Sequence, residues 1–242
     1  MLIKSYDERM LRRETNIKTV LKFLRDETWS NGSILATVLS LSKTGIYKTL
    51  GHMEKSGFIC AYHISDLNKK IYGITSQGLL YAWDEDEQMQ IRACFEPSKV
   101  KPLMIQHHLD IQIARLNAQK KAWQNWIPGH LLPKNIAKRP DAIVKDPTGK
   151  MIAIEIERTV KTRKRYEAIF AIYLQAIKRG EYESIHYVCP DLTFATRLER
   201  LFNLIDAVPI AGQRVSIGDK HRAKFPVYPL NQWPKAVETF EK

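Results

Sequence analysis

Residues 15–83 carry the pattern that most constrains the fold of this chain of 242 residues. Three segments repeat apolar residues at the spacing of an amphipathic helix, and they cover 15–29, 31–41 and 42–57. Ser42 opens the last of them as a cap-forming residue, and a glycine closes it. The sequence therefore predicts three consecutive helices, with only a short connection between the second and the third.

Two runs rich in aromatic and β-branched residues follow these helices. They cover 58–65 and 69–75, and residues 66–68 form the expected turn between them. Three helices followed by a two-stranded ribbon resemble the winged-helix domains of bacteria, in which the third helix enters the major groove of DNA. We therefore expect residues 1–83 to form a winged-helix DNA-binding domain.

The net charge agrees with a polyanionic partner, since 38 Lys and Arg stand against 26 Asp and Glu, for a formal charge of +12. Anionic membranes and ribosomes also attract basic proteins, so the net charge alone does not identify DNA as the partner. Seven polar residues of the third helix and of the ribbon are the candidate DNA contacts, although a generic polar helix face would look the same. They are Lys43, Thr44, Tyr47, Lys48, His52, Lys69 and Lys70.

A linker is expected at 84–102, where an acidic run and two prolines interrupt helical patterning. Residues 103–242 then read as a second domain of the α/β (α+β) class with a central mixed sheet. The expected order is a long helix, a strand, a hairpin of two strands, a helix, a strand and a helix. Strand candidates after residue 205 are not placed by the sequence.

The hairpin gathers acidic residues. Alternation along 151–157 puts the isoleucines on one face and Glu155 and Glu157 on the other. The preceding strand begins at Asp141, and the turn at 146–150 can bring it beside the glutamates. Clustered carboxylates repel one another, and a hard divalent cation such as Mg²⁺ or Mn²⁺ relieves that repulsion. A solvated strand face is the alternative interpretation.

These acids resemble the motif of the PD-(D/E)xK restriction-endonuclease-like superfamily. The residues that match are Arg139–Asp141 ("RPD") and Ile154–Glu157 ("IEIE"). Glu157 occupies the position where the superfamily usually has lysine, so Lys161 or Lys164 would have to supply the positive charge. The resemblance implies metal-dependent cleavage of DNA. It assigns catalytic roles to Asp141, Glu155, Glu157 and Lys161, the three acids being the metal ligands.

The pairing of a winged helix with this core resembles the MobC-type (MOBC class) plasmid relaxases and the replication-relaxation proteins. The similarity covers about residues 15–205 and includes, in order, a helix with two histidines, "RPDA" and "ExExT". It implies nicking of one strand at a plasmid transfer origin, for conjugative transfer. The partners implied are an accessory mobilisation protein and a type IV coupling protein.

Further candidates surround the acids. Arg163, Lys164 and Arg165 would form a phosphate-binding rim or, alternatively, a solvated helix face. The long helix offers three accessory ligands or proton carriers, which could equally be structural. They are His107, His108 and Asp110.

Two other functions stay open. A non-enzymatic DNA-binding protein, either a transcription regulator or a plasmid replication initiator, needs only the winged helix. A free-standing restriction-like or repair endonuclease would cut both strands or act without an origin. The sequence shows no signal peptide and no apolar run long enough to cross a membrane, so we expect a cytoplasmic protein.

Overall fold

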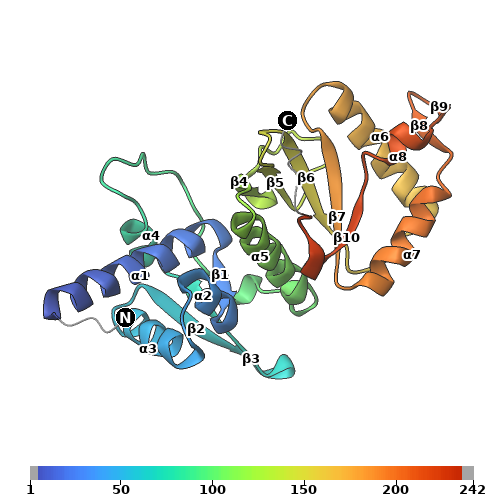
Figure 1. Ribbon diagram of the computed structural model, residues 1–242. Helices are drawn as coiled ribbons and strands as arrows, with labels where there is room; N and C mark the ends of the chain where they lie inside the picture. Colours follow the sequence, from blue (N-terminus) through green and yellow to red (C-terminus); the bar gives the residue numbers. More distant parts are fainter. Residues whose placement is uncertain (1–4, 236–242) are drawn as a thin grey trace. The chain divides into compact units, whose positions relative to one another are not determined.

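The structure is a computed structural model that describes residues 5–235, and it has a mixed α/β fold. The chain forms two compact units, Met1–Leu109 and Asp110–Lys242 (Figure 1). Each unit is described by itself below. Among the described residues, no helix combines the length and the apolar character that crossing a bilayer requires.

The first unit contains four helices and a small antiparallel sheet. The sheet has the strand order β1-β3-β2. Its elements are α1 (Tyr6–Glu27), β1 (Trp29–Asn31), α2 (Gly32–Leu39), α3 (Lys43–Lys55), β2 (Ile59–Ile64), β3 (Lys69–Ile74) and α4 (Ser76–Tyr81). The three predicted helices and the hairpin of β2 and β3 are confirmed.

Local chemistry explains the boundaries of α3. The Ser42 hydroxyl accepts a hydrogen bond from the Gly45 amide at 3.2 Å, which satisfies one of the unpaired donors of the first turn. Gly57 has a φ of 73° just after the helix, a left-handed conformation that glycine adopts without strain. The apolar stripe of α3 is buried against α1 and α2. Its residues are Ile46, Leu50 and Met53.

The expected start of the first helix was wrong. It begins at Tyr6 instead of near residue 15, because Ser5 and Glu8 form a capping box in which each side chain accepts the other's backbone amide. The ribbon also has a third strand. β1 pairs with β3, with Trp29 opposite Gly73.

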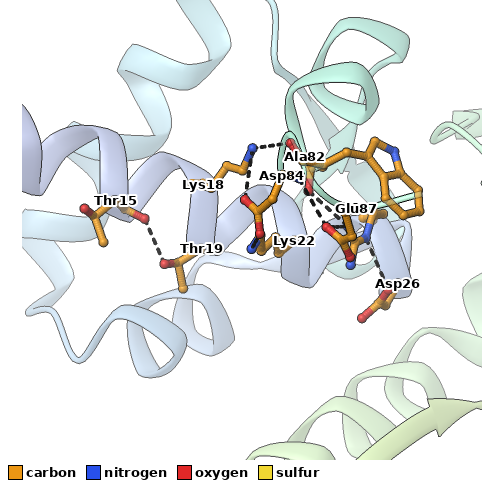
Figure 2. A network of polar contacts seen from close by, with 10 residues as sticks. Thr15, Lys18, Thr19, Lys22, Asp26, Ala82, Asp84 and Glu87 are labelled. Atoms are coloured by element: carbon orange, nitrogen blue, oxygen red, sulfur yellow. Dashed lines mark hydrogen bonds and ion pairs between the residues drawn. The ribbon is translucent and has the colours of Figure 1, made fainter. Parts of the chain in front are cut away.

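Residues 84–102 belong to the first unit, and two parts of the segment are held against it. Asp84 forms ion pairs with Lys18 and Lys22 of α1, and Glu87 lies 2.9 Å from Arg25 (Figure 2). These contacts with cations lower the pKa of both carboxyls, mainly through hydrogen bonds with Lys22 and Arg25. The acidic run that suggested a linker therefore complements the basic face of α1.

Phe95 anchors the end of this segment. Its side chain is only 7% exposed, and its amide donates to the Ile74 carbonyl at 2.9 Å. A Cβ on Gly73 would lie 1.9 Å from the Phe95 ring, so only glycine leaves room for the ring here. The boundary between the two units falls after Leu109, within α5 (Ile105–Lys120), and not at the expected linker.

The second unit is a sheet covered by helices on both faces (Figure 1). The five-stranded sheet has the order β10-β7-β6-β5-β4 and mixes parallel with antiparallel pairs. Its strands are β4 (Gln124–Pro128), β5 (Ala142–Lys145), β6 (Met151–Ile156), β7 (Ser184–Cys189) and β10 (Val227–Pro229). The helices are α5 on one face, and α6 (Arg163–Lys178) and α7 (Leu192–Asn203) on the other.

The strand β6 is buried on both sides. Its isoleucines pack with Ile111 and Ala114 of α5, as the alternation predicts. Ala153 points the other way and packs with Tyr166 and Phe170 of α6. The glutamate-bearing face is therefore covered by α6 and is not a solvated strand face.

The region after residue 205 supplies one edge strand of the central sheet and a separate small sheet. Strand β10 pairs in parallel with β7, with Val227 opposite Tyr187. Strands β8 (Ala207–Ile210) and β9 (Gln213–Ser216) form a separate two-stranded sheet, followed by the short helix α8 (Asp219–Arg222). The sequence indicated strands in this region but did not predict which strands pair with each other.

We predict that Phe95→Ala lowers the free energy of unfolding of the first unit by about 3 kcal/mol, the usual cost of truncating a buried aromatic side chain. Urea denaturation with a probe in this unit measures the change. Ile91→Ala is the matched control, since Ile91 lies in the same segment and is 100% exposed. An equally small effect of both substitutions would contradict the docking of this segment.

Candidate functional site

The hairpin of β5 and β6 sets the position of the first acid. At the turn, the Asp146 carboxylate accepts hydrogen bonds from the amides of Thr148 and Lys150, both at 2.9 Å, and Gly149 has a φ of 83°. The register that follows pairs Ala142 with Ile154. The turn thus fixes which residues face each other at the far end of the hairpin.

Asp141 is held close to Glu155 by its bonds to the backbone of β6. Its amide donates to the Ile154 carbonyl at 2.9 Å, and its Oδ2 accepts from the Ile156 amide at 2.7 Å. Asp141 immediately precedes Ala142, the first residue of β5, so it lies just beyond the last paired residues of β5 and β6. Its carboxyl group is close enough to Glu155 to raise the pKa of that residue. The structure therefore brings together the two acids that the sequence predicted.

Glu155 is buried, with 8% of the residue exposed. Burial raises the pKa of its carboxyl, and the neighbouring Asp141 raises it further. Two donors offset this cost: the Lys138 Nζ lies 2.5 Å from Oε1, and the Tyr173 hydroxyl donates to the same oxygen. The pair of acids is thus stabilised from one side by a lysine and a tyrosine.

Glu157 has contact partners that differ from those of Asp141 and Glu155. It is 4% exposed, and its Oε2 accepts from the Lys161 ammonium and, at 3.0 Å, from the Tyr166 hydroxyl. Burial and the adjacent carboxylate raise the pKa of Tyr166. Tyr166 and Tyr173 are seven residues apart on α6, which is about two helical turns. Each glutamate consequently has its own lysine and tyrosine.

The expected metal site can be tested against this geometry. Within residues 5–235, no group of three or more His, Cys, Asp and Glu is arranged to hold a metal ion. The neighbouring carboxylates of Asp141 and Glu155 do fit a cation, because they are hard oxygen donors whose mutual repulsion a cation would relieve. Mg²⁺ in phosphate-processing sites commonly takes only one or two protein carboxylates. A site with two carboxylate ligands therefore fits the residues present. The role of Glu157 as a third ligand stays a prediction from the sequence.

The sequence did not identify Lys138 as the cation that contacts Glu155. Lys161, the expected catalytic lysine, is paired with Glu157, whereas Lys138 contacts Glu155. The only signal was the run "KRPD", in which Lys138 precedes Asp141 by three residues. Nothing in the sequence identified Tyr173 as its companion.

The other basic and acidic candidates of the second unit have different surroundings. Arg163 pairs with Glu167 at 2.9 Å and with Asp206 at 3.4 Å, so it is already engaged. Lys164 and Arg165 are exposed at the start of α6. Asp110 is buried and paired with Arg158, the residue that follows Glu157.

The two histidines of α5 belong to the first unit. The His108 Nε2 lies 3.1 Å from the Glu27 carbonyl oxygen, and its ring is 4.2 Å from the ring of Trp29. His107 is half-buried. The contacts of His108 connect α5 with the end of α1, which is a structural role.

Most of the expected DNA-contacting residues of α3 are accessible. Lys43, Thr44, Tyr47 and Lys48 are exposed, on the side opposite the buried stripe. His52 is half-buried and contacts Arg13, and burial together with that cation lowers its pKa.

The hairpin carries its two lysines differently. Lys70 is exposed, with Nζ 5.1 Å from the centre of the Tyr72 ring. Lys69 donates to the Gln106 side chain at 3.1 Å. Lys70 is therefore the better placed of the two for an external partner.

Comparison of the chain with protein-family models, with curated proteins and with solved structures gave no match. The family resemblance drawn from the motifs accordingly stays a prediction.

We predict that Lys138→Met destabilises the second unit by about 3 kcal/mol at pH 8, the usual cost of leaving a buried charge unpaired. The substitution removes the cation that lowers the pKa of Glu155, so that pKa rises further. Between the pKa of Glu155 in the unfolded chain and its raised pKa in the folded variant, the folded variant binds more protons than its unfolded chain. The loss of stability relative to the parent therefore shrinks as the pH falls.

Urea denaturation of the parent and of the variant at pH 8 and pH 5 measures the difference. Lys138→Arg, which keeps a cation at this position, is the control and should lose much less. A loss that is the same at both pH values would contradict the assignment of Lys138 to Glu155.

Proposed function

We propose that the protein binds double-stranded DNA through α3 and the β2–β3 hairpin, and that its second unit nicks one DNA strand with a divalent cation. The observation that carries the proposal is the closeness of two acids: Asp141, just before β5, and Glu155, on the neighbouring strand β6. As substrate we propose a plasmid transfer origin, on the strength of the resemblance to MobC-type relaxases. An accessory mobilisation protein and a type IV coupling protein are the corresponding partners.

Support for DNA binding comes from the first unit. Its α3 presents an exposed polar face with two lysines, and it follows α2 after a short connection. The hairpin after α3 carries the exposed Lys70. These features support a binding mode in which α3 enters the major groove while the hairpin contacts the adjacent backbone.

The proposed chemistry assigns a task to each residue of the second unit. Asp141 and Glu155 would hold Mg²⁺ or Mn²⁺, which supplies charge neutralisation at the phosphate and lowers the pKa of a bound water. Tyr173 and Lys138 fix the Glu155 carboxylate in place. Lys164 and Arg165, exposed at the start of α6, are available to bind the DNA backbone.

We predict that Asp141→Asn abolishes nicking, with a loss of at least about a hundredfold in rate, because the cation loses a charged ligand. The assay uses supercoiled DNA that carries the region around the gene, with Mn²⁺, and follows conversion to open circles. Glu183→Gln is the matched control: Glu183 is a carboxylate of the same unit that pairs with Lys224. Undiminished nicking by Asp141→Asn would rule out this mechanism.

The form of the product separates nicking from double-strand cleavage. Open circles support a relaxase, whereas linear DNA indicates a restriction-like or repair endonuclease.

For DNA binding, we predict that Lys48→Ala weakens affinity and lowers the slope of log K against log salt by about 1, as expected for one lost phosphate contact. Fluorescence anisotropy with a duplex at several salt concentrations measures both quantities. Lys121→Ala is the control, since Lys121 is an exposed lysine of the second unit. Equal slopes for the parent and Lys48→Ala would argue against α3 as the binding helix.

A second function has one observation in its favour. Both glutamates are satisfied by cations of the chain itself, Lys138 and Lys161, so their burial is explained without a metal. A non-enzymatic regulator or replication initiator would need nothing more. It would bind its DNA site with an affinity indifferent to Mn²⁺ and would leave both strands intact.

A further inference from the structure

The β8–β9 hairpin stands outside the central sheet and exposes one strand. Strand β8 packs on α6 through Val208, which is fully buried. All four residues of β9 are exposed, and Val215 is 41% exposed. Among the described residues, the backbone of β9 forms hydrogen bonds only with β8. β9 is thus an open edge strand.

A hollow lies beside this edge. Its volume is about 570 Å³, within the range of ligand-binding pockets. It is bounded by α6, by the β8–β9 hairpin and by α8 with its flanking residues. Its apolar lining consists of Leu174, Ile177, Ile210, Val215 and Ile217.

The register of the hairpin relates the edge to the hollow. Val215 is directly opposite Val208, so both side chains lie on the face that packs toward α6. A third strand added along β9 would place a residue beside Val215 on that same face. An apolar side chain at this position would continue the row of Val208 and Val215 and would lie over the hollow.

The rim of the hollow is basic. Lys178, Lys220, His221 and Lys224 line it, and within residues 5–235 no acidic residue does. Lys224 already pairs with Glu183 at 2.6 Å. Lys178 and Lys220 form no ion pair with any described residue. The hollow therefore complements a ligand that combines an apolar group with negative charge.

We propose that this surface binds an extended acidic segment of a partner protein, which adds to β9 as a third strand and inserts an apolar side chain into the hollow. The open backbone edge favours a peptide over a small amphipathic anion, because only a peptide can pair with the amides and carbonyls of β9. This docking site does not depend on any DNA-cleaving activity of the protein.

The probe for this proposal is a fluorescent nine-residue peptide in which glutamate alternates with isoleucine or threonine. Fluorescence anisotropy with the full chain should show saturable binding that weakens with salt. Val215→Asp and the double substitution Lys178→Glu and Lys220→Glu should each lower affinity about tenfold or more, the effect of losing about 1.4 kcal/mol. Leu192→Asp is the control, since Leu192 is an exposed apolar residue that does not line the hollow.

Backbone methylation tests strand addition itself. Two versions of the peptide carry N-methyl groups on alternate residues, so that each blocks one edge. The version whose methyl groups block the edge that faces β9 should lose binding. The version methylated on the opposite edge should keep it. Circular dichroism checks that every variant is folded.

Three outcomes would overturn the proposal. They are an absence of saturable binding, unchanged affinity of folded Val215→Asp, and equal binding of both methylated peptides. The last would indicate a site for small amphipathic anions.

Discussion

The burial of Glu155 close to Asp141 is the constraint on which the rest of the second unit depends. The Glu155 carboxylate is costly to bury, because it loses solvation and the nearby Asp141 repels its negative charge. The register of the β5–β6 hairpin creates this situation, and a slip by one residue would turn Glu155 toward α5 instead. The Asp146 turn therefore matters to the chemistry as well as to the fold.

Helix α6 contributes two tyrosines that donate hydrogen bonds to the buried acids, one to each glutamate. Tyr173 donates to Glu155, and Tyr166 donates to Glu157. Both rings also belong to the apolar core between α6 and the sheet. The same side chains thus pack the core and orient the acids. A lysine completes each set, so each buried carboxylate has a cation and a hydroxyl donor as partners.

The parts of this arrangement that depend on local sequence were predictable. Alternation along β6 identified the isoleucine face, and the turn residues identified the hairpin, so Asp141 and Glu155 were expected to meet. Lys138 was not, because its contact with Glu155 depends on how the chain before β5 packs. Phe95 was missed for the same reason: it follows an acidic segment, and its place on Gly73 is a tertiary contact. Strand β1 is only three residues long and carries no periodicity to detect.

The central claim is that Asp141 and Glu155 together hold a divalent cation, and crystals of the protein soaked in Mn²⁺ test it most directly. Anomalous diffraction locates the bound manganese without reference to activity. The account predicts a peak between the two carboxylates, within the usual coordination distance of about 2.0–2.6 Å for hard cations. A fully soaked crystal with no manganese peak at this position would contradict it.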